Sequence, residues 1–402
     1  MQAVVKNPPL PRQYGEELLV LERGEGCRLF DRAGRAYLDM GAGIAVNALG
    51  YGREDLAVIA ASQMKRLIHV SNLFATPPQL ALAEKLTAVS IPGSEQFTAV
   101  HFGNSGAEAN ETAIKYARLY ARARGRKNAH RLIAFSNGFH GRTMGALSLT
   151  ANRAYRTAFE PLLPGCEILP FNDSQSLFAH LDGSAAAVIV EPVQGEGGLQ
   201  QLSAEFADTL NTLCRKYDVL LIADEVQTGL GRCATLFASE LTQLSPDIVT
   251  LSKPLAGGLP LSAVLIPQKV NELLKPGDHA TTFGGGPVTT AVAMKVWDTV
   301  SAPNFLSEVK RKGELTASLL REGLEGIPHE LRGAGLLRGV RLTDEKYGGP
   351  WCAKIISQTR EQGVIILKTG ADVLRLAPPL IIHNDELKEG IQTLCRVIQA
   401  NL

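Results

Sequence analysis

The sequence predicts an α/β fold in which a largely parallel β-sheet is covered by helices on both faces, with a smaller α+β layer beside it. Three observations lead to this prediction. Between residues 98 and 266, short apolar segments alternate with helical segments. The apolar segments lack the polar alternation of strands that face water on one side, so both of their faces are expected to be buried. The chain has 402 residues, more than one hydrophobic core usually holds, so a second and smaller unit is expected.

The two ends of the chain are expected to form the smaller unit together. We assign residues 1–52 to an N-terminal part of the small domain, residues 53–300 to a large cofactor-binding domain, and residues 301–402 to the C-terminal small domain. The sequence contains no internal repeat and no low-complexity segment that would favour another arrangement.

The first elements precede the alternating region. Residues 20–51 are rich in glycine and in short β-like pieces, which predicts hairpins. Helical periodicity follows at residues 54–68 and 77–89. The second of these helices has a proline in its first turn, where no amide hydrogen is needed.

Six apolar segments in the main region are predicted to be strands of the sheet. They cover residues 99–102, 132–135, 186–190, 219–223, 248–251 and 262–266. Amphipathic helices are predicted between several of them, at residues 107–123 and 204–216. Ligands of such sheets bind beyond the carboxyl ends of the strands, so the residues that follow these segments are candidates for a functional site.

The C-terminal part predicts the smaller α+β unit. After a glycine-rich stretch at 283–287, a helix at 288–300 is expected to connect the two units. Further helices are predicted at 303–325, 351–362 and 385–400, and strands around 335–343 and 363–376.

The composition excludes several classes of function. With 41 basic and 40 acidic residues and a net charge of +1, the chain has no general attraction for nucleic acid or an anionic membrane. The expected partners are therefore small molecules or a second copy of the chain. No apolar stretch approaches the ~18 residues of a membrane span, and the three prolines near the N-terminus argue against a signal peptide.

The six cysteines are widely scattered along the chain, at positions 27, 166, 214, 233, 352 and 395. No C-x-x-C pair and no cluster of histidines accompanies them, so neither a disulfide framework nor a zinc site is indicated. We expect a soluble protein in a reducing cytoplasm.

A lone lysine follows the strand predicted at 248–251. Lys253 precedes Pro254, Gly257 and Gly258, which enforce a turn and place the ammonium group where the chain leaves the core. This presentation suits a lysine that forms a Schiff base, and the alternative interpretation is a surface lysine at a strand end.

The first strand is followed by a possible anion site. Ser105, Gly106 and Ala107 are small and open a helix, so they would expose successive backbone amides at its N-terminus. The alternative is an ordinary capped turn between a strand and a helix. Neither a Walker-type phosphate loop nor a G-x-G-x-x-G motif occurs here.

Aromatic and charged side chains follow three further strands. They are Phe139, His140 and Arg142 after the second strand, Glu191 and Glu196 after the third, and Asp224 and Glu225 after the fourth. Carboxylates beside apolar strands need cationic partners, because burying them unpaired is costly. A metal held by Glu191, Asp224 and a histidine is conceivable, but no ligand spacing supports it, and we expect no metal site.

Together these groups meet the needs of pyridoxal 5′-phosphate. The phosphate requires a helix N-terminus, the ring an aromatic side chain, the pyridinium nitrogen a carboxylate, and the aldehyde a lysine. Parallel strands bring all of these groups to one edge of the sheet, so the combination indicates this cofactor although each group alone does not.

Six motifs closely resemble those of the class III, fold type I, pyridoxal-phosphate aminotransferases. They are Asn104-Ser-Gly-Ala-Glu-Ala-Asn110, Phe139-His-Gly-Arg-Thr143, Glu191-Pro-Val-Gln-Gly-Glu-Gly-Gly198, Asp224-Glu-Val-Gln-Thr-Gly-Leu-Gly-Arg232, Ser252-Lys-Pro-Leu-Ala-Gly-Gly258 and Arg375-Leu-Ala-Pro-Pro-Leu380. They occur in the family's order, and the resemblance runs from about residue 14 to the C-terminus. It implies a mostly parallel seven-stranded sheet between helices, with a smaller α+β domain built from both ends of the chain.

The resemblance also implies how the cofactor is held. Lys253 would bond covalently to the cofactor aldehyde and then move the substrate proton, and Asp224 would keep the pyridinium nitrogen protonated. The other implied contacts are Gln227 to the ring hydroxyl, Phe139 to the ring face, and Ser105, Gly106 and Ala107 to the phosphate. Thr282 would reach the phosphate from a second subunit, which implies a homodimer with shared active sites.

Four residues are implied in substrate binding. Arg142 would bind the substrate α-carboxylate with its planar fork of donors. Arg375 neutralised by Glu196 would suit an amine whose near end is uncharged, and Arg375 released from Glu196 would suit glutamate or 2-oxoglutarate. Tyr14 would help to position the amino substrate, or would serve only in packing.

Within the family, three segments are most similar to the acetylornithine aminotransferases. They are Gly43-Ile-Ala-Val-Asn-Ala-Leu-Gly50, the Glu-Gly-Gly ending of the glutamate motif, and Gly277-Asp-His-Ala-Thr-Thr-Phe283. The implied reaction moves the terminal amino group of N2-acetylornithine to 2-oxoglutarate. Alternatives with the same machinery are succinylornithine, ornithine, acetyl-lysine and 4-aminobutyrate aminotransferases, and an aminomutase is a more distant one.

Two residues depart from the family pattern. Gly286 stands where many relatives have asparagine, and Tyr51 stands where a histidine is usual. Neither belongs to the implied catalytic set, and the sequence does not rank the acyl groups that the amino substrate could carry.

Overall fold

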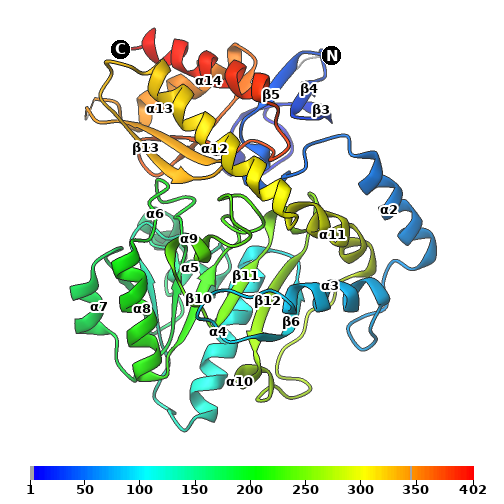
Figure 1. Cartoon of the computed structure of the whole chain (residues 1–402), viewed down its shortest axis with the longest axis vertical. Coiled ribbons are helices and arrows are strands. Elements are labelled where there is room, and N and C mark those ends of the chain that lie inside the picture. The colour runs from blue at the N-terminus through cyan, green and yellow to red at the C-terminus, as the bar shows by residue number, and fades with distance from the viewer. Residues whose placement is uncertain (1–3, 345) are drawn as a thin grey trace.

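The computed structural model describes residues 4–344 and 346–402 of the chain (Figure 1). Its largest sheet has seven strands in the order β6-β12-β11-β10-β9-β7-β8. The strands are β6 (Phe97–Gly103), β7 (Arg131–Phe135), β8 (Cys166–Leu169), β9 (Ala185–Val190), β10 (Leu220–Asp224), β11 (Ile248–Leu251) and β12 (Ser262–Pro267). Only β12 runs antiparallel to its two neighbours in this sheet, so the predicted, mostly parallel seven-stranded sheet is confirmed.

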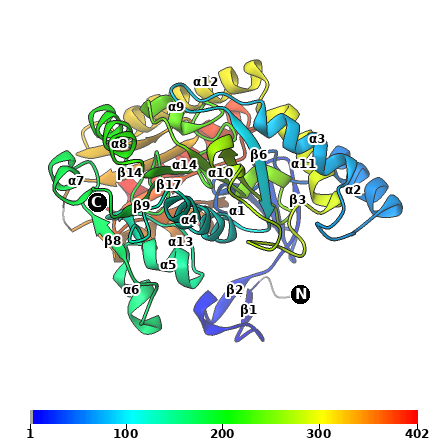
Figure 2. The same ribbon diagram turned by 90° about the horizontal axis from the view of Figure 1, so that it is seen from below.

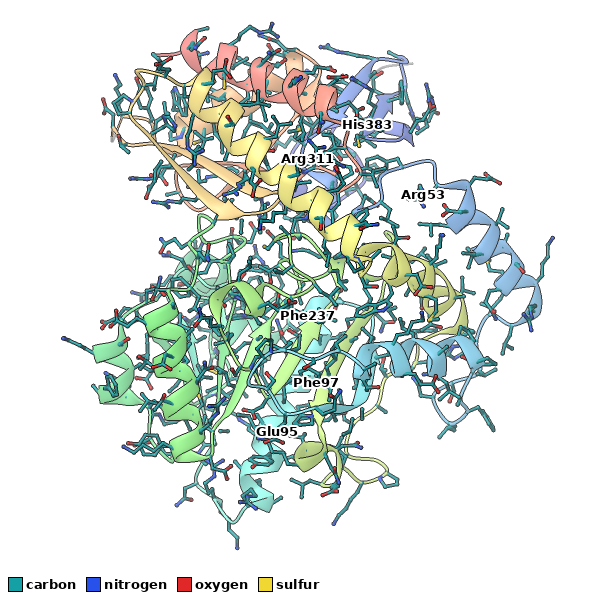
Figure 3. All side chains as sticks on the ribbon, viewed as in Figure 1. Arg53, Glu95, Phe97, Phe237, Arg311 and His383 are labelled. Carbon is teal, nitrogen blue, oxygen red and sulfur yellow. The ribbon has the colours of Figure 1, made fainter. Side chains whose placement is uncertain are left out.

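Both faces of the sheet are apolar because successive side chains of its inner strands enter different hydrophobic cores. In β10, Leu221 packs in a cluster that includes Phe206 of α8 (Ala204–Tyr217), and Ile222 packs in a cluster that includes Ala113 of α4 (Gly106–Ala123). Helices α3 (Pro77–Thr87) and α11 (Pro287–Val300) contribute to the first cluster, and α5 (Met144–Leu149) contributes to the second. Phe97 and Phe237, both buried, belong to the first cluster and are labelled in Figure 3.

One strand of the sheet was not among the six apolar segments. Strand β8 lies at the edge and pairs only with β7. Its Glu167 is bound by Arg131 and His180, so the segment is less apolar than an inner strand. An edge strand needs only one buried face, which is why the search for continuously apolar runs missed it.

Two smaller sheets form a second layer at the top of Figure 1. One has the order β13-β14-β17-β16 and the other the order β15-β5-β4-β3. Their strands are β3 (Leu21–Glu25), β4 (Arg28–Asp31), β5 (Ala36–Asp39), β13 (His329–Ala334), β14 (Leu337–Leu342), β15 (Val364–Ile365), β16 (Leu367–Thr369) and β17 (Val373–Leu376). Because β15 pairs with β5, the C-terminal segment completes a sheet begun near the N-terminus.

A single hydrophobic cluster joins the two chain ends. It contains Leu38 and Met40 together with residues of α12 (Pro303–Gly323), α13 (Gly349–Glu361) and α14 (Asn384–Gln399). This arrangement agrees with a small unit built from both ends, whereas the domain boundaries at residues 52 and 300 stay a prediction.

The prediction of hairpins over residues 20–51 was correct only in part. Strands β3, β4 and β5 form an antiparallel meander, but the following residues form turns around α1 (Ala42–Ala45). Gly43 and Ile44 have φ angles of 62° and 65°, which a strand does not allow. The short strands β1 (Val4–Lys6) and β2 (Glu17–Leu19) were also not predicted, and they extend away from the sheets in Figure 2.

The remaining helices are α2 (Glu54–Arg66), α6 (Arg153–Arg156), α7 (Ser174–His180), α9 (Ala238–Thr242) and α10 (Gln268–Asn271). Short 3-10 turns occur at η1 (Arg12–Tyr14), η2 (Thr157–Phe159) and η3 (Lys253–Ala256). Among residues 4–344 and 346–402, we found no helix that combines the length and the apolar character of a membrane span.

Candidate active site

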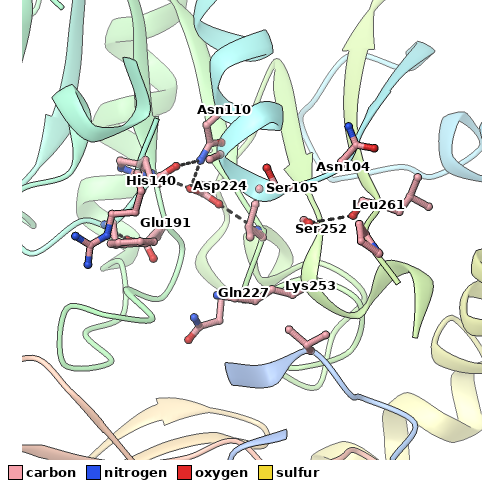
Figure 4. Close-up of a pocket in the computed structure, with 18 of the residues that line it drawn as sticks. Asn104, Ser105, Asn110, His140, Glu191, Asp224, Gln227, Ser252, Lys253 and Leu261 are labelled. Carbon is pink, nitrogen blue, oxygen red and sulfur yellow. Dashed lines mark hydrogen bonds and ion pairs between the residues drawn. The ribbon is translucent and has the colours of Figure 1, made fainter. Parts of the chain in front are cut away.

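A cavity of about 410 Å³ lies at the carboxyl ends of the parallel strands (Figure 4). Eight of the twelve residues proposed for the site line it: Ser105, Gly106, Ala107, Phe139, Arg142, Asp224, Gln227 and Lys253. The topology of the sheet is therefore what brings these distant segments together. Glu196 lines a neighbouring cavity of about 560 Å³ that shares Phe139 with the first.

Lys253 begins the turn η3 directly after β11. Its φ angle is +23°, and Gly257 ends the turn in the left-handed region, so the backbone reverses sharply below the cavity. The pKa of Lys253 is lowered to about 8, chiefly because little water remains to solvate its ammonium group, and the charge of Arg375 contributes in the same direction. The carboxylates of Glu196, Asp224 and Glu191 act in the opposite direction. Lys253 is thus a half-buried amine that loses its proton more readily than an exposed lysine.

Asp224 ends β10 and is almost completely buried. Its Oδ2 accepts a hydrogen bond of 2.8 Å from Asn110 Nδ2 and lies 2.8 Å from Nδ1 of His140, and its Oδ1 accepts one of 3.1 Å from the amide of Val226. These contacts fix the orientation of the carboxylate at the cavity wall, as Figure 4 shows. Burial alone would lower the pKa of His140, but the hydrogen bond and charge of Asp224 raise it overall.

The sequence placed His140 among the side chains that follow the strands but gave it no role in holding the cofactor, and it did not single out Asn110. Asn110 lies on α4, donates to the carbonyl of His140 at 2.7 Å and accepts from the Thr250 hydroxyl at 2.8 Å. One amide side chain thus links α4, β11, Asp224 and the segment that carries Phe139. The asparagine at the end of the motif Asn104–Asn110 was the available signal, since an asparagine within an apolar helix face needs polar partners.

Glu191 holds two loops beside the cavity through hydrogen bonds to their backbone. Its Oε2 accepts from the amide of Phe139 at 2.9 Å, and its Oε1 accepts from the amide of Gly195 at 3.1 Å. Burial raises the pKa of Glu191 to about 7. Within residues 4–344 and 346–402, no three His, Cys, Asp or Glu side chains gather where they could hold a metal ion.

The proposed anion loop is the N-terminus of α4. Ser105 is the N-cap, and its hydroxyl accepts from the amide of Glu108 at 3.3 Å. The amides of the first helical turn have no partner within the helix, so those of Gly106 and Ala107 are available to an anion. A Cβ at Gly106 would lie 2.6 Å from Cγ1 of Val226, so only glycine permits this approach of the helix to the strand-end loop.

Phe139 and Arg142 belong to an aromatic cluster with Tyr155. The guanidinium carbon of Arg142 lies 3.5 Å from the centre of the Tyr155 ring and 5.6 Å from that of Phe139. The Arg142 side chain is otherwise exposed at the cavity mouth, where it can meet a carboxylate. Tyr155 was not predicted, because it lies on the short helix α6 outside every motif.

Arg375 and Glu196 form an ion pair. Nη1 of Arg375 lies 2.5 Å from Oε1 of Glu196, and it also donates to Gly195 O at 2.9 Å. Gln227 contacts both partners, with its Nε2 3.4 Å from Glu196 Oε1 and its Oε1 3.3 Å from Arg375 Nη1. Although burial acts to raise the pKa of Glu196, the charge of Arg375 lowers it overall. The carboxylate is therefore held in its charged form.

Four proposed residues do not line the first cavity: Glu196 and Arg375, which form the ion pair beside it, and Thr282 and Tyr14. Thr282 lies in an exposed loop before α11 and lines a separate cavity of about 640 Å³ with Asn72 and Thr281. Tyr14 ends the turn η1, and its side chain lies outside the described part of the structure.

Known proteins with a similar sequence agree with this geometry. A family model described as "Aminotransferase class-III" matches residues 10–398. The chain belongs to the class III aminotransferases. The chain is 41% identical over 394 residues to a mitochondrial acetylornithine aminotransferase of Alnus glutinosa, covering 96% of this chain and 85% of the relative.

Solved structures of class III aminotransferases share the fold. The N-acetylornithine aminotransferase of Stenotrophomonas maltophilia has a TM-score of 0.82 and 35% identity, covering 97% of this chain and 98% of that one. The ornithine aminotransferase of Toxoplasma gondii, described with partial occupancy of pyridoxal phosphate at its active site, has a TM-score of 0.87 and 31% identity, covering 95% and 90%. Pyridoxal 5′-phosphate is the cofactor of this family, and this chain is a pyridoxal-phosphate-dependent aminotransferase.

The two departures from the family pattern lie outside the cavity of this aminotransferase. The Tyr51 hydroxyl donates to Asp39 at 2.5 Å, and a Cβ at Gly24 would overlap its ring. Gly286 is the N-cap of α11, and a Cβ there would lie no closer than 3.4 Å to its neighbours. A Cβ atom is therefore tolerated at position 286, and nothing in the structure explains the glycine.

The lowered pKa of Lys253 predicts unusual reactivity. In the cofactor-free aminotransferase, acylation of Lys253 by a trace of acetic anhydride is expected to rise with pH and to reach half of its maximum near pH 8. An exposed lysine at its ordinary pKa of about 10.4 has less than about 1% of the reactive neutral amine at that pH. Peptide mass spectrometry over a pH series measures the extent of acylation at Lys253 and, as an internal control, at the exposed Lys310 of α12. Equal midpoints for the two lysines would contradict the burial argument.

Proposed function

We propose that this enzyme transfers the terminal amino group of N2-acetylornithine to 2-oxoglutarate, giving N-acetylglutamate 5-semialdehyde and glutamate in arginine biosynthesis. The observation that carries the proposal is the Arg375–Glu196 ion pair beside Lys253, because it offers a neutral and a cationic form of one subsite. The names of relatives about 40% identical over most of the chain support the choice of substrate.

The residues of the cavity fit pyridoxal 5′-phosphate. The first-turn amides of α4 match its phosphate, the Phe139 ring its face, and the buried Asp224 carboxylate its ring nitrogen. We assign the phosphate to Ser105, Gly106 and Ala107. When bound, the cofactor supplies an electron sink that acidifies the hydrogen on the carbon bearing the substrate amine.

Lys253 acts as the base and acid of the transfer. Its lowered pKa leaves about a tenth of the amine neutral at pH 7, far more than in an exposed lysine, and the neutral amine is needed to bond to the cofactor and to accept the substrate proton. Asp224, oriented by Asn110 and His140, maintains a negative charge where the ring nitrogen must stay protonated. Gln227 lies on the cavity wall, where we assign it to the ring hydroxyl, and it also contacts the Arg375–Glu196 pair.

Arg142 is assigned to the substrate α-carboxylate. Its guanidinium is held over Tyr155 at the cavity mouth, so the plane of its donors is already oriented before a substrate arrives. Tyr14 keeps its proposed part in positioning the amino substrate.

The ion pair explains how one site accepts two donors. With Glu196 bound to Arg375, the subsite has no free cation and accepts the uncharged methylene end of the ω-amine substrate, next to the reacting amine. For glutamate, the second carboxylate of the substrate replaces Glu196 at Arg375. About a third of the Glu196 side chain is exposed, so it can move aside, whereas that of Arg375 is buried.

Replacing Glu196 with alanine tests this function. We expect the preference for glutamate over acetylornithine, measured as the ratio of half-reaction rate constants by stopped-flow absorbance, to rise by at least about tenfold. The reason is that the charge of Arg375 is then no longer neutralised by Glu196, which suits the carboxylate and opposes the uncharged chain. Glu205→Ala on the exposed surface of α8 is the matched control. An unchanged ratio would count against the switch.

The same assay separates the rival substrates. Acetylornithine, succinylornithine, ornithine and 4-aminobutyrate are added singly to the cofactor-loaded enzyme, and the visible spectrum is followed. Fast conversion by acetylornithine alone is expected. A glutamate half-reaction, which an aminomutase would not need, excludes that reaction class.

We propose a cytoplasmic homodimer with shared active sites. The α2–α3 loop and the loop before α11 expose Ile68, Leu73, Phe74 and Phe283, and the rings of His69 and Phe283 lie 5.5 Å apart. Such an apolar surface is suited to a second copy of the chain. The adjacent Thr282 would then complete the phosphate site of the partner. Sedimentation equilibrium is expected to give a mass of twice 43.1 kDa.

All six cysteines are free, in keeping with a reducing compartment. Cell fractionation tests the proposed cytoplasmic location.

A further inference from the structure

The loop that carries Glu196 is fastened by a hydroxyl group from the second layer. Thr369 ends β16 and is 2% exposed. Its Oγ1 donates to the carbonyl of Gly195 at 2.7 Å and accepts from the amide of Gly198 at 3.1 Å. One side chain therefore bridges the residues on both sides of the Glu196–Gly197 pair.

The residue after Thr369 adds a third bond. The amide of Gly370 donates to the carbonyl of Glu196 at 2.9 Å. Gly370 has a φ angle of +59°, and a Cβ there would lie 3.2 Å from the Cα of Gly198. Glycine thus allows the two backbones to approach closely enough for this bond.

The opposite side of the loop is held by packing and by Glu191. Glu191 accepts from the Gly195 amide, and a Cβ at Gly195 would lie 2.3 Å from Oε1 of Gln227. A Cβ at Gly197 would lie 2.4 Å from the carbonyl oxygen of Asn137. The loop backbone is therefore confined on both sides, while the Glu196 side chain remains about one-third exposed.

Thr369, which holds the Glu196 loop, and Arg375, which pairs with Glu196, belong to one β-hairpin. Strands β16 and β17 pair with Thr369 opposite Val373 and with Leu367 opposite Arg375. The hairpin thus presents the Arg375 guanidinium to the Glu196 carboxylate and, through Thr369, also fixes the backbone from which that carboxylate extends. The 2.5 Å contact between them depends on this shared support.

We propose that Thr369 is a positioning residue that sets the amino-donor specificity of the enzyme. It holds the Glu196 backbone in place, so that the exchange between the ω-amine and the dicarboxylate donor occurs by rotation of the Glu196 side chain alone. The proposal rests on the proposed function of the Arg375–Glu196 pair, and it adds a residue from outside every motif of the sequence. Without the Thr369 hydroxyl, the loop shifts, Glu196 neutralises Arg375 less completely, and the acylated amine is disfavoured.

The test compares Thr369→Val, which lacks the hydroxyl at nearly equal volume, with Thr369→Ser, which retains it. Both half-reactions are followed by stopped-flow absorbance in the cofactor-loaded enzyme. For Thr369→Val, we expect the acetylornithine half-reaction to fall about tenfold and the glutamate half-reaction to change by less than about twofold, as befits one or two lost hydrogen bonds. Thr369→Ser is expected to keep the ratio of the parent enzyme.

The same change in a Glu196→Ala background distinguishes positioning from general destabilisation. Because Thr369 acts through Glu196, Thr369→Val should not alter the donor ratio further in that background. Equal losses in both half-reactions, or a shift of the ratio that persists without Glu196, would overturn the proposal. If the parent enzyme reacts with another ω-amine instead of acetylornithine, the proposed substrate is wrong, and the ratio measured with that amine still decides the role of Thr369.

Discussion

Replacing Lys253 with alanine is expected to lower amino transfer by at least roughly 10³-fold, because one side chain supplies both the covalent attachment of the cofactor and the proton transfer. Lys253 is the only lysine among the described residues that line the cavity, so no other side chain there can take over the covalent attachment. The half-reactions with glutamate and acetylornithine should fall together, since both depend on the same base.

Single-turnover kinetics at saturating cofactor measure this effect. Lys310→Ala, which removes an exposed lysine of α12, is the matched control and should react at the rate of the parent enzyme. Circular dichroism and cofactor absorbance report whether the variant is folded and loaded. Turnover of Lys253→Ala at the parent rate would refute the mechanism.

Replacing Asp224 with alanine is expected to cause the second largest loss, roughly 10²-fold or more in both half-reactions. The carboxylate is the negative charge proposed to face the cofactor's ring nitrogen, and it is buried where water cannot replace it. Its removal also leaves the donors of Asn110 and His140 without their acceptor. Burial lowers the pKa of His140, and the hydrogen bond and charge of Asp224 raise it. Without Asp224, the pKa of His140 should therefore fall.

The Asp224 experiment needs two readouts. Cofactor retention during dialysis separates weakened binding from weakened chemistry, and the half-reaction rate at saturating cofactor measures the latter. Asp208→Ala, on the exposed face of α8, serves as the control. A variant that retains the cofactor and reacts as fast as the parent would show that Asp224 has no catalytic part.

The sheet could be predicted because its inner strands are buried on both faces. Residues such as Leu221 and Ile222 enter different cores, so the segment is apolar throughout and stands out in the sequence. Strand β8 did not stand out, since Glu167 sits at an edge with Arg131 beside it. The turns around Gly43 and Ile44 were mistaken for strands because left-handed φ angles leave little trace in short glycine-rich segments.

The candidate site was predictable where its residues directly follow strands. Lys253 and Asp224 stand at the ends of β11 and β10, and the topology of a parallel sheet brings such positions together. Thr369 lies 174 residues from its acceptor Gly195, and no local pattern indicates that pairing. Tyr155 was missed for the same reason, because its role depends on where α6 places it against Arg142.

Borohydride reduction of the purified, cofactor-loaded enzyme, followed by peptide mass spectrometry, tests the central assignment most directly. Reduction makes the link between the cofactor and its lysine permanent, so the modified peptide identifies the residue that holds it. We predict that the cofactor is found on Lys253, and that prior incubation with acetylornithine removes most of this label. Finding the cofactor on another lysine would contradict the account. So would an amount of cofactor on Lys253 that prior incubation with acetylornithine leaves unchanged.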